Sequence, residues 1–138
     1  MRIESGAQLP GWAEDLVSAL DEKMGLTLSE VTAHRVAGSM PVAGNTQPFL
    51  LWHGGASCVL VETLSSLGAA CLGYPSLVGA GVDINVTHLR PVRSGRVHGV
   101  ATPVRTGGRT VVFQAELRDD DGELVAVGRL TCRLVKRP

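Results

Sequence analysis

Residues 53–72 read HGGASCVLVETLSSLGAACL, a run of apolar and small residues that contains a single charged residue, Glu62. A run of this length and composition predicts a helix buried within protein. It opens with His53-Gly54-Gly55, and the two glycines let the backbone come close to a ligand where the helix begins. The free N–H groups of a helix start favour negative charge, including charge that develops only in a transition state. The segment therefore predicts a helix whose start can polarise an electrophile and whose middle carries an isolated acid.

Length and composition predict one domain that spans residues 1–138. An apolar content of 44% and a charged content of 19% are typical of a folded protein rather than a disordered one. The net charge of zero gives no global attraction to nucleic acid or to an anionic membrane, and only one Tyr, two Phe and two Trp are available to stack on bases. We therefore expect no nucleic-acid partner.

The three cysteines, Cys58, Cys71 and Cys132, form no CxxC pair. This pattern fits a reduced cytosol and argues against a disulfide scaffold or a zinc site. The segment Met1–Pro10 lacks the apolar core of a secretory signal. The only membrane candidate, Ala56–Leu72, is barely long enough to span and carries Glu62 near its centre, so a helix buried in protein is the better interpretation. We expect a cytoplasmic protein with no membrane partner and no metal.

The rest of the chain predicts one further helix and a sheet. Apolar residues recur at helical spacing from Trp12 to Met24, which predicts a helix over about 10–25 that ends near Gly25. Strand-like composition follows over 26–36, 78–89, 95–105, 110–118 and 123–135, with a hairpin turn at 119–122. The short links between strands imply an antiparallel sheet. The fold class is therefore α+β, with about five strands wrapped around one long central helix.

Three motifs carry a resemblance to a known family: QPFLLWHGGAS at 47–57, then Glu62, then GVDINVTHLR at 81–90. Together they resemble the hotdog-fold acyl-CoA thioesterases, in the branch that includes the bacterial 4-hydroxybenzoyl-CoA and 1,4-dihydroxy-2-naphthoyl-CoA enzymes. The resemblance runs from about Met24 to Val135 and so covers nearly the whole chain. Trp52 departs from it, because relatives often carry a smaller aliphatic residue there, and Asp83 stands where Glu is frequent.

The resemblance implies a hotdog fold and hydrolysis of an acyl-CoA, preferably an aryl-CoA, without a metal or redox cofactor, since coenzyme A is part of the substrate. By that resemblance Glu62 is the catalytic nucleophile or general base, and the Gly54 N–H polarises the thioester carbonyl. Gln47 and His53 shape that site, and Ser66 matches a hydroxyl position that places the carboxylate or the attacking water. Taken singly, each has a structural alternative: a hydrogen-bond network for Glu62, tight helix-to-sheet contact for Gly54, and packing for His53 and Ser66.

Helix geometry adds an expectation about assembly. Gly54 and Glu62 are eight residues apart, which is about 12 Å along a helix, whereas both must lie about 3 Å from the reacting group. A second copy that runs antiparallel in a two-fold dimer brings the start of one helix beside the middle of the other. We therefore expect a homodimer with shared active sites. As a separate expectation, two such dimers form a homotetramer. Glu62 and Ser66 are four residues apart and act from a single chain.

Several residues are candidates for binding the substrate. Arginines make the middle of the chain locally basic, and we predict that Arg90 and Arg109, as a pair, hold the phosphates of coenzyme A with the N–H groups of a turn at Gly108. Their alternative is that they are solvated strand ends. His88, Phe49 and Leu67 are predicted to line the acyl pocket, with core packing as the alternative for each.

Two other classes remain open for a hotdog domain. Enoyl-CoA hydratases usually present an Asp and His pair on the helix, whereas this helix offers Glu62 with no His after His53. Acyl-CoA-binding regulators normally carry a DNA-binding segment, whereas the first 25 residues contain only one amphipathic helical pattern. A thioester hydrolase is therefore the predicted function.

Overall fold

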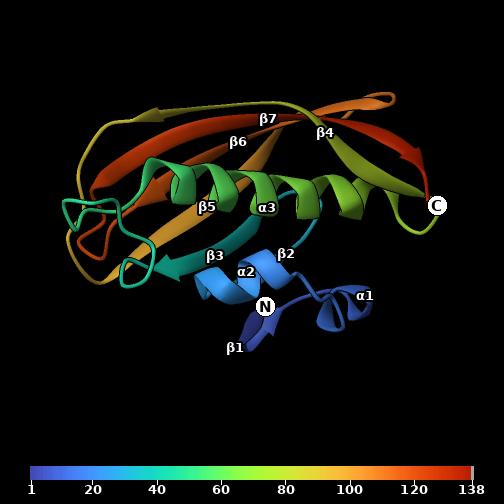
Figure 1. The fold of residues 1–138 in the computed structure, drawn as a ribbon. Coiled ribbons are helices and arrows are strands. Elements are labelled where there is room, and N and C mark those ends of the chain that lie inside the picture. The colour runs from blue at the N-terminus through green and yellow to red at the C-terminus, as the bar shows by residue number, and fades with distance from the viewer. Residues whose placement is uncertain (138) are drawn as a thin grey trace.

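The computed structural model describes residues 1–137, which form a curved sheet with one long helix across its concave face (Figure 1). In chain order the elements are β1 (Arg2–Gln8), α1 (Gly11–Glu14), α2 (Ala19–Met24), β2 (Thr27–Val31), β3 (Val36–Pro41), α3 (Gly54–Gly73), β4 (Leu77–His88), β5 (Arg96–Arg105), β6 (Thr110–Arg118) and β7 (Leu124–Lys136). The long central helix predicted from residues 53–72 is α3, so the α+β class is confirmed.

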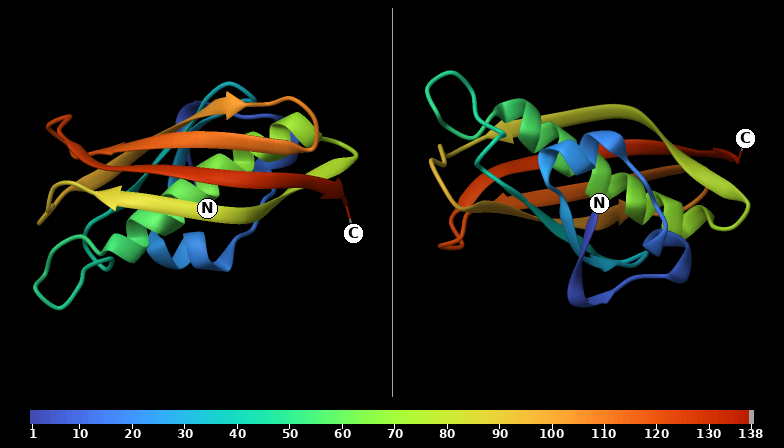
Figure 2. Two further views of the ribbon diagram at one scale, coloured as in Figure 1. Left: turned by 90° about the horizontal axis from the view of Figure 1, so that it is seen from above. Right: turned by 60° about the horizontal axis from the view of Figure 1, so that its bottom comes forward.

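The sheet has seven strands in the order β1-β2-β3-β5-β6-β7-β4. Every neighbouring pair is antiparallel except β1 and β2, which are parallel. Figure 2 shows α3 running obliquely beneath the strands, while the N-terminal elements lie on the side of α3 that faces away from β6 and β7. The helix therefore has one face covered by the sheet and another that the N-terminal segment shields.

The predicted strands after α3 agree with the structure to within two residues at each end, whereas the N-terminal predictions need correction. The single strand expected over 26–36 is two strands, because the Thr32 hydroxyl accepts hydrogen bonds from the N–H groups of His34 and Arg35 and turns the chain. The single helix expected over 10–25 is two short ones. A hydroxyl cap from Ser18 starts α2, and Gly25, in the left-handed region at φ 71°, ends it.

Strand β1 was not predicted, and its side chains explain why. Six of its seven residues are exposed, so the segment lacks the alternation of apolar and polar residues that marks a half-buried strand. Counting β1 and the separate β3, the sheet has seven strands rather than about five.

The core lies between α3 and the sheet, and glycines set how closely the two approach. A Cβ at Gly68 of α3 would lie 2.4 Å from the ring of Phe113 on β6, and a Cβ at Gly99 of β5 would lie 2.6 Å from the side chain of Leu64. Ten of the residues of α3 are buried. In length and hydropathy α3 passes the test for a membrane-spanning helix, as core helices of soluble proteins also do, and half of its most apolar window is buried against the rest of the chain.

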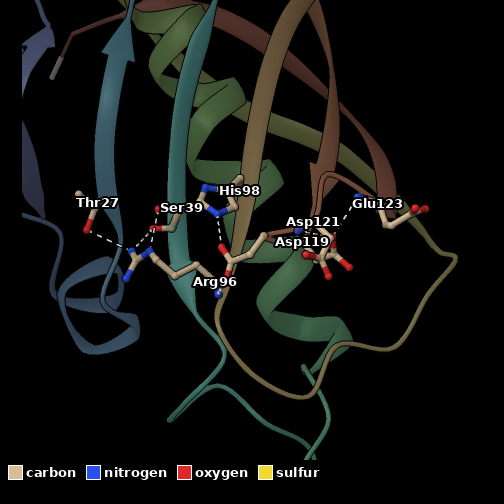
Figure 3. A network of polar contacts seen from close by, with 8 residues as sticks. Thr27, Ser39, Arg96, His98, Asp119, Asp121 and Glu123 are labelled. Atoms are coloured by element: carbon tan, nitrogen blue, oxygen red, sulfur yellow. Dashed lines mark hydrogen bonds and ion pairs between the residues drawn. The ribbon is translucent and has the colours of Figure 1, made fainter.

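One of the arginines in the basic middle of the chain has a structural role (Figure 3). The guanidinium of Arg96 donates to Ser39 Oγ at 2.9 Å, to the Ser39 carbonyl at 3.0 Å and to Thr27 Oγ1 at 3.2 Å, and so joins β5 to β3 and β2. Beside it, His98 bonds Asp120 of the β6–β7 turn at 2.7 Å, and this bond, with that from the Arg96 N–H, holds the pKa of Asp120 below its usual value. Arg96 is therefore engaged within its own chain.

Candidate active site

The start of α3 presents one free backbone donor. His53 is the N-cap, and its Nδ1 accepts the N–H of Gly55 at 2.8 Å. The N–H of Gly54 has no acceptor within residues 1–137. Because the helix dipole also points at this position, the Gly54 N–H can donate to an oxygen that gains negative charge.

The loop before α3 is anchored at its base and exposed at its tip. The Asn45 side chain donates to the carbonyls of Met24 and Pro41, both at 2.8 Å, and the His53 N–H donates to the Asn45 carbonyl at 2.9 Å. Farther along, the indole N–H of Trp52 donates to Ser57 Oγ at 2.7 Å in a buried contact. These bonds fix the loop to the first turns of α3. The conformation of the loop and the position of the helix start therefore depend on each other.

At the tip of this loop, Gln47 organises the backbone. Its side-chain oxygen accepts the N–H of Phe49, its carbonyl accepts the N–H of Leu50 at 2.9 Å, and its own N–H donates to the Leu51 carbonyl at 2.8 Å. Phe49 and Leu50 are 80% and 71% exposed, and Leu50 has a φ of 62°. The tip is thus a tight turn that holds two large apolar side chains in solvent.

A hollow of about 410 Å³, the helix-start hollow, lies between this loop and the end of β4. It is lined by Gln47, Gly54, His88 and Arg90 among others. His88 lies directly over Gly54, since a Cβ at Gly54 would be 2.8 Å from His88 Nε2. The structure therefore brings four of the predicted site residues together here, and His53 is exposed beside them.

A second hollow of about 380 Å³, the Glu62 hollow, lies along the middle and end of α3 under the N-terminal segment. Glu62, Ser66 and Leu67, three of the predicted site residues, line it. Its other walls are mostly apolar and include Trp12 and Tyr74, whose rings stack with centroids 5.4 Å apart.

Glu62 is half-buried and has no ion pair within the described residues. Its carboxylate faces Gly81 of β4 so closely that a Cβ there would lie 2.6 Å from Oε1. Burial raises the pKa of Glu62 above its ordinary value of 4.5. Burial and the charge of Glu62 also raise the pKa of the nearby Cys132 thiol to about 11, so this thiol is neutral at physiological pH. The environment thus makes Glu62 more basic than an exposed carboxylate.

The two hollows share no lining residue. Gly54 and Glu62 lie eight residues apart on α3, which is about 12 Å at the helical rise. One chain therefore holds the free N–H of Gly54 and the carboxylate of Glu62 in two separate hollows. Phe49 lines neither hollow.

The predicted phosphate contacts do not come together within one chain. The N–H of Arg90 bonds the Val125 carbonyl at one end of β7, and the carbonyl of Arg109 accepts the Leu134 N–H near the other. Val125 and Leu134 are nine residues apart on this strand, which corresponds to about 30 Å. Arg90 and Arg109 of the same chain therefore cannot hold one set of phosphates together.

The two arginines also differ in their surroundings. Arg90 lines the helix-start hollow and forms an exposed ion pair with Glu123 at 3.5 Å. Arg109 follows Gly108, which adopts a φ of 76° in the exposed β5–β6 turn. Only Arg90 adjoins the predicted catalytic residues of its own chain. No group of three or more His, Cys, Asp or Glu side chains within residues 1–137 could hold a metal ion.

Comparison with known proteins identifies the family. The family model of the thioesterase superfamily matches residues 51–126, more than half of the chain, from the loop before α3 into β7. The chain belongs to the thioesterase superfamily. It is 43% identical over 99 residues to 1,4-dihydroxy-2-naphthoyl-CoA hydrolase of Escherichia coli K12, covering 70% of this chain and 72% of that protein. It is 35% identical over 112 residues to the proofreading thioesterase EntH of Klebsiella pneumoniae, covering 80% and 79%.

Solved structures agree with these relatives. A thioesterase from Haemophilus influenzae superposes with a TM-score of 0.82 at 35% identity, covering 86% of this chain and 84% of that one. A mutant thioesterase from Pseudomonas aeruginosa gives a TM-score of 0.82 at 34% identity, covering 87% and 88%. The hotdog fold and the assignment of this thioesterase as a thioester hydrolase are confirmed.

Sequence reasoning missed the N-terminal contribution to the Glu62 hollow. Trp12 and Asp21 line it, and Asp21 bonds Thr63, the residue that follows Glu62. In the sequence, Ser18 precedes Asp21 by three residues, a spacing that marks a helix start and so suggests only a capping role for the acid. Asp21 is buried in the fold, whereas a residue with only a capping role need not be. This burial distinguishes Asp21, and the sequence alone does not show it.

Proposed function

We propose that this thioesterase hydrolyses an acyl-CoA thioester, with Glu62 of one subunit and Gly54 of the partner subunit acting on the same carbonyl. The observation that carries the proposal is the division of one chain into two half-sites, a free N–H at the start of α3 and a half-buried carboxylate about 12 Å along it. Each half-site lacks the group that the other supplies.

The chemistry needs only these groups and water. The thioester oxygen accepts the Gly54 N–H, and the carboxylate of Glu62 attacks the carbonyl carbon or removes a proton from the attacking water. The C–S bond breaks, coenzyme A leaves as a thiolate, and water supplies the hydroxyl of the acid product. The raised pKa of Glu62 favours proton transfer, because a stronger base is a better proton acceptor near neutral pH. The proposal includes no metal or redox cofactor.

The edge of the sheet supports a two-fold dimer. β4 is the last strand of the sheet, and it exposes the apolar side chains of Val82 and Ile84, which are 66% and 36% exposed. An unpaired strand edge with apolar side chains is suited to pairing with another chain. Two antiparallel β4 strands would run the two α3 helices antiparallel and place the start of each beside the middle of the other. We further propose a tetramer built from two such dimers, in the cytoplasm.

For the acyl group we propose an aromatic ring. The Glu62 hollow is lined by stacked aromatic side chains, and the similar protein of Escherichia coli is named for an aryl-CoA substrate. Gln47, His53 and Ser66 orient the reacting groups in this proposal. His88 and Arg90 contact the substrate from the helix-start hollow, and Leu67 contacts the acyl group. From the exposed loop tip and turn, Phe49, Gly108 and Arg109 contact substrate bound to the partner.

The direct test measures release of free coenzyme A from a panel of acyl-CoA substrates with a thiol-detecting reagent. Wild-type protein should release coenzyme A fastest from aryl-CoA substrates. Glu62→Gln should fold and bind substrate but turn over orders of magnitude more slowly, since an amide is neither a base nor a comparable nucleophile. Turnover within a few-fold of wild type would remove Glu62 from catalysis.

The shared site has its own test. Glu62→Gln and Gln47→Ala should each be nearly inactive as homodimers. In a mixed dimer one site carries both substitutions and the other carries neither, so co-expression should restore activity toward half of wild type per heterodimer. Sites built within one chain would leave both sites defective. A purified heterodimer with no recovered activity would therefore contradict the shared site.

A further inference from the structure

Trp52 and Ser57 form a buried hydrogen bond at the start of α3, and the proposed mechanism uses neither residue. The indole N–H of Trp52 donates to Ser57 Oγ at 2.7 Å, and the bond has this direction because an indole N–H is only a donor. Trp52 is 7% exposed and Ser57 is 0% exposed, and both line the helix-start hollow with Gly54. The bond is therefore shielded from water and adjoins the hollow that holds the free backbone donor.

The two residues occupy the positions of a helix staple. His53 is the N-cap of α3, so Trp52 directly precedes the cap and Ser57 is the fourth residue of the helix. Apolar side chains at these two positions often pack together and fix the angle at which the chain enters a helix. In this chain a hydrogen bond joins the same two positions. Trp52 and Ser57 therefore fix the entry angle through a directional bond.

The start of α3 needs restraints from outside its own backbone. Gly54 and Gly55 have no side chains to hold the first turn, and glycine adopts more backbone conformations than other residues. The backbone of Trp52 is held, because its N–H donates to the Val92 carbonyl at 2.8 Å. The indole bond connects this held residue to the first turn of α3 across the two glycines. Loss of the bond would let the Gly54 N–H turn relative to the loop.

Packing alone does not explain this pair. An apolar residue in place of Ser57 would pack against a buried ring without the cost of removing a hydroxyl from water. The hydroxyl of Ser57 is instead fully buried and matched to one donor. Ser65, which lies on the same helix and is equally buried, has a hydroxyl with no hydrogen-bond partner among residues 1–137. The bond from Trp52 to Ser57 is therefore a specific contact rather than a consequence of burial.

We propose that Trp52 is a positioning residue, which acts through Ser57 to hold the Gly54 N–H in the direction that meets the thioester oxygen. The inference rests on the proposed function and deepens it, because it concerns the donor that polarises the carbonyl. Such a donor is effective only where it already points at the oxygen that gains charge. In this role neither side chain touches the reacting atoms, and both affect the rate through Gly54.

The size of the effect follows from the role of the donor. Removal of one such donor lowers kcat by about 100- to 1,000-fold, and a displacement of about 1 Å can cost about 100-fold. Loss of the indole bond loosens the donor without removing it, so kcat should fall by about 10-fold. An interaction made only in the transition state changes kcat and kcat/KM equally, so KM should stay within about 2-fold of wild type.

The experiment breaks the bond from each side and measures release of coenzyme A. Trp52→Phe removes the donor and Ser57→Ala removes the acceptor, and each should lower kcat by about 10-fold. The double variant should be within about 2-fold of either single variant, because both substitutions break the same bond. Ser57→Thr keeps a hydroxyl acceptor, so its kcat should stay within about 3-fold of wild type. Ser65→Ala is the matched control, since it removes an equally buried hydroxyl that bonds to nothing, and it should leave kcat unchanged.

A vibrational measurement reports on the donor directly. A hydrogen bond from Gly54 should lower the carbonyl stretching frequency of benzoyl-CoA bound to Glu62→Gln, the variant that should bind without turnover. Adding Ser57→Ala should return this frequency part of the way to its value in free benzoyl-CoA, whereas adding Ser65→Ala should not. A role in stability alone would lower the melting temperature and leave the frequency unchanged.

The outcomes separate this inference from the proposed function. Wild-type kcat in Trp52→Phe and Ser57→Ala, losses that multiply in the double variant, or a raised KM at unchanged kcat would each overturn the role of Trp52 and leave the hydrolase intact. If no thioester is hydrolysed, the proposed function fails. The amide resonance of Gly54 then decides whether Trp52 and Ser57 hold this N–H. Ser57→Ala should shift the resonance and Ser57→Thr should not, and a resonance that Ser57→Ala leaves in place would overturn the inference.

Discussion

Replacement of Gly81 by Ala should lower turnover while leaving the fold intact. Gly81 lies on β4, and a Cβ at this position would be 2.6 Å from Glu62 Oε1, whereas ordinary contacts begin at 3.4 Å. The oxygen must therefore retreat by about 0.8 Å, and it can do so because it ends a flexible side chain. Displacement of a reacting group by about 1 Å can cost about 100-fold in rate, so we expect kcat to fall by about that factor.

Gly79 of the same strand provides the matched comparison. A Cβ at Gly79 would lie 2.8 Å from Ala69 Cβ, an atom fixed to the backbone of α3 that cannot rotate away. Overpacking of this kind costs about 1 to 3 kcal/mol, which corresponds to a fall of about 3 to 10 °C in the melting temperature of a domain of this size. Gly79→Ala should therefore lose stability, whereas the melting temperature of Gly81→Ala should stay within about 3 °C of wild type.

The assay combines thermal unfolding with steady-state release of coenzyme A for both variants. Loss of kcat in Gly81→Ala at an unchanged melting temperature would support placement of the reacting carboxylate beneath β4. Wild-type kcat in Gly81→Ala would refute the reasoning, because it would mean that the position of the Glu62 carboxylate does not matter to the reaction. A large fall in its melting temperature would instead show that Glu62 cannot move aside.

Two further predictions concern strain and pH. Leu50→Gly should raise the melting temperature by a few degrees, because a left-handed Leu costs about 1 to 2 kcal/mol and this exposed side chain contributes little packing. The greater conformational entropy of Gly in the unfolded chain offsets part of this gain. A fall in the melting temperature would contradict the strain argument. The acid limb of kcat/KM should lie above pH 4.5, because burial raises the pKa of Glu62 and the reaction needs its ionised form. The folded protein then binds this proton more tightly than the unfolded chain, so the stability that Glu62 contributes is greatest below pH 4.5 and is lost as the pH rises through its raised pKa. As the pH rises through the raised pKa of Glu62, the melting temperature of Glu62→Gln should therefore increase relative to that of wild type. If the two melting temperatures changed in parallel with pH, the raised pKa would be contradicted.

The sequence could predict those elements in which the buried residues follow a regular pattern along the chain. α3 is apolar for nearly its whole length, and β6 alternates buried and less buried residues, so composition and periodicity placed them. β1 is exposed on nearly every residue, and its pairing with β2 depends on contacts between distant segments. No local sequence pattern predicts the pairing of β1 with β2.

In the candidate site too, local motifs could be predicted from sequence and contacts between distant segments could not. The motif spacing predicted Gln47, Gly54 and Glu62 as site residues, because these residues lie on one loop and one helix. The separation of Arg90 from Arg109 depends on which ends of β7 they adjoin, and this follows only from strand order and register. Asp21 was missed because its significance comes from burial against Thr63, a residue 42 positions away.

In the proposed active site, one chain supplies the free N–H group and the other supplies the half-buried carboxylate. Helix geometry explains this division. Free N–H groups occur only at a helix start, whereas burial, which raises the pKa of Glu62, occurs in its middle. Asp21 and the apolar walls lie with Glu62 in one hollow, and Gln47 and His88 lie with Gly54 in the other. Under the proposed mechanism, the chain that supplies the carboxylate also binds the acyl group, while its partner polarises the carbonyl. Substitutions in the Glu62 hollow can then change which acyl group is accepted without disturbing the donor that every thioester requires.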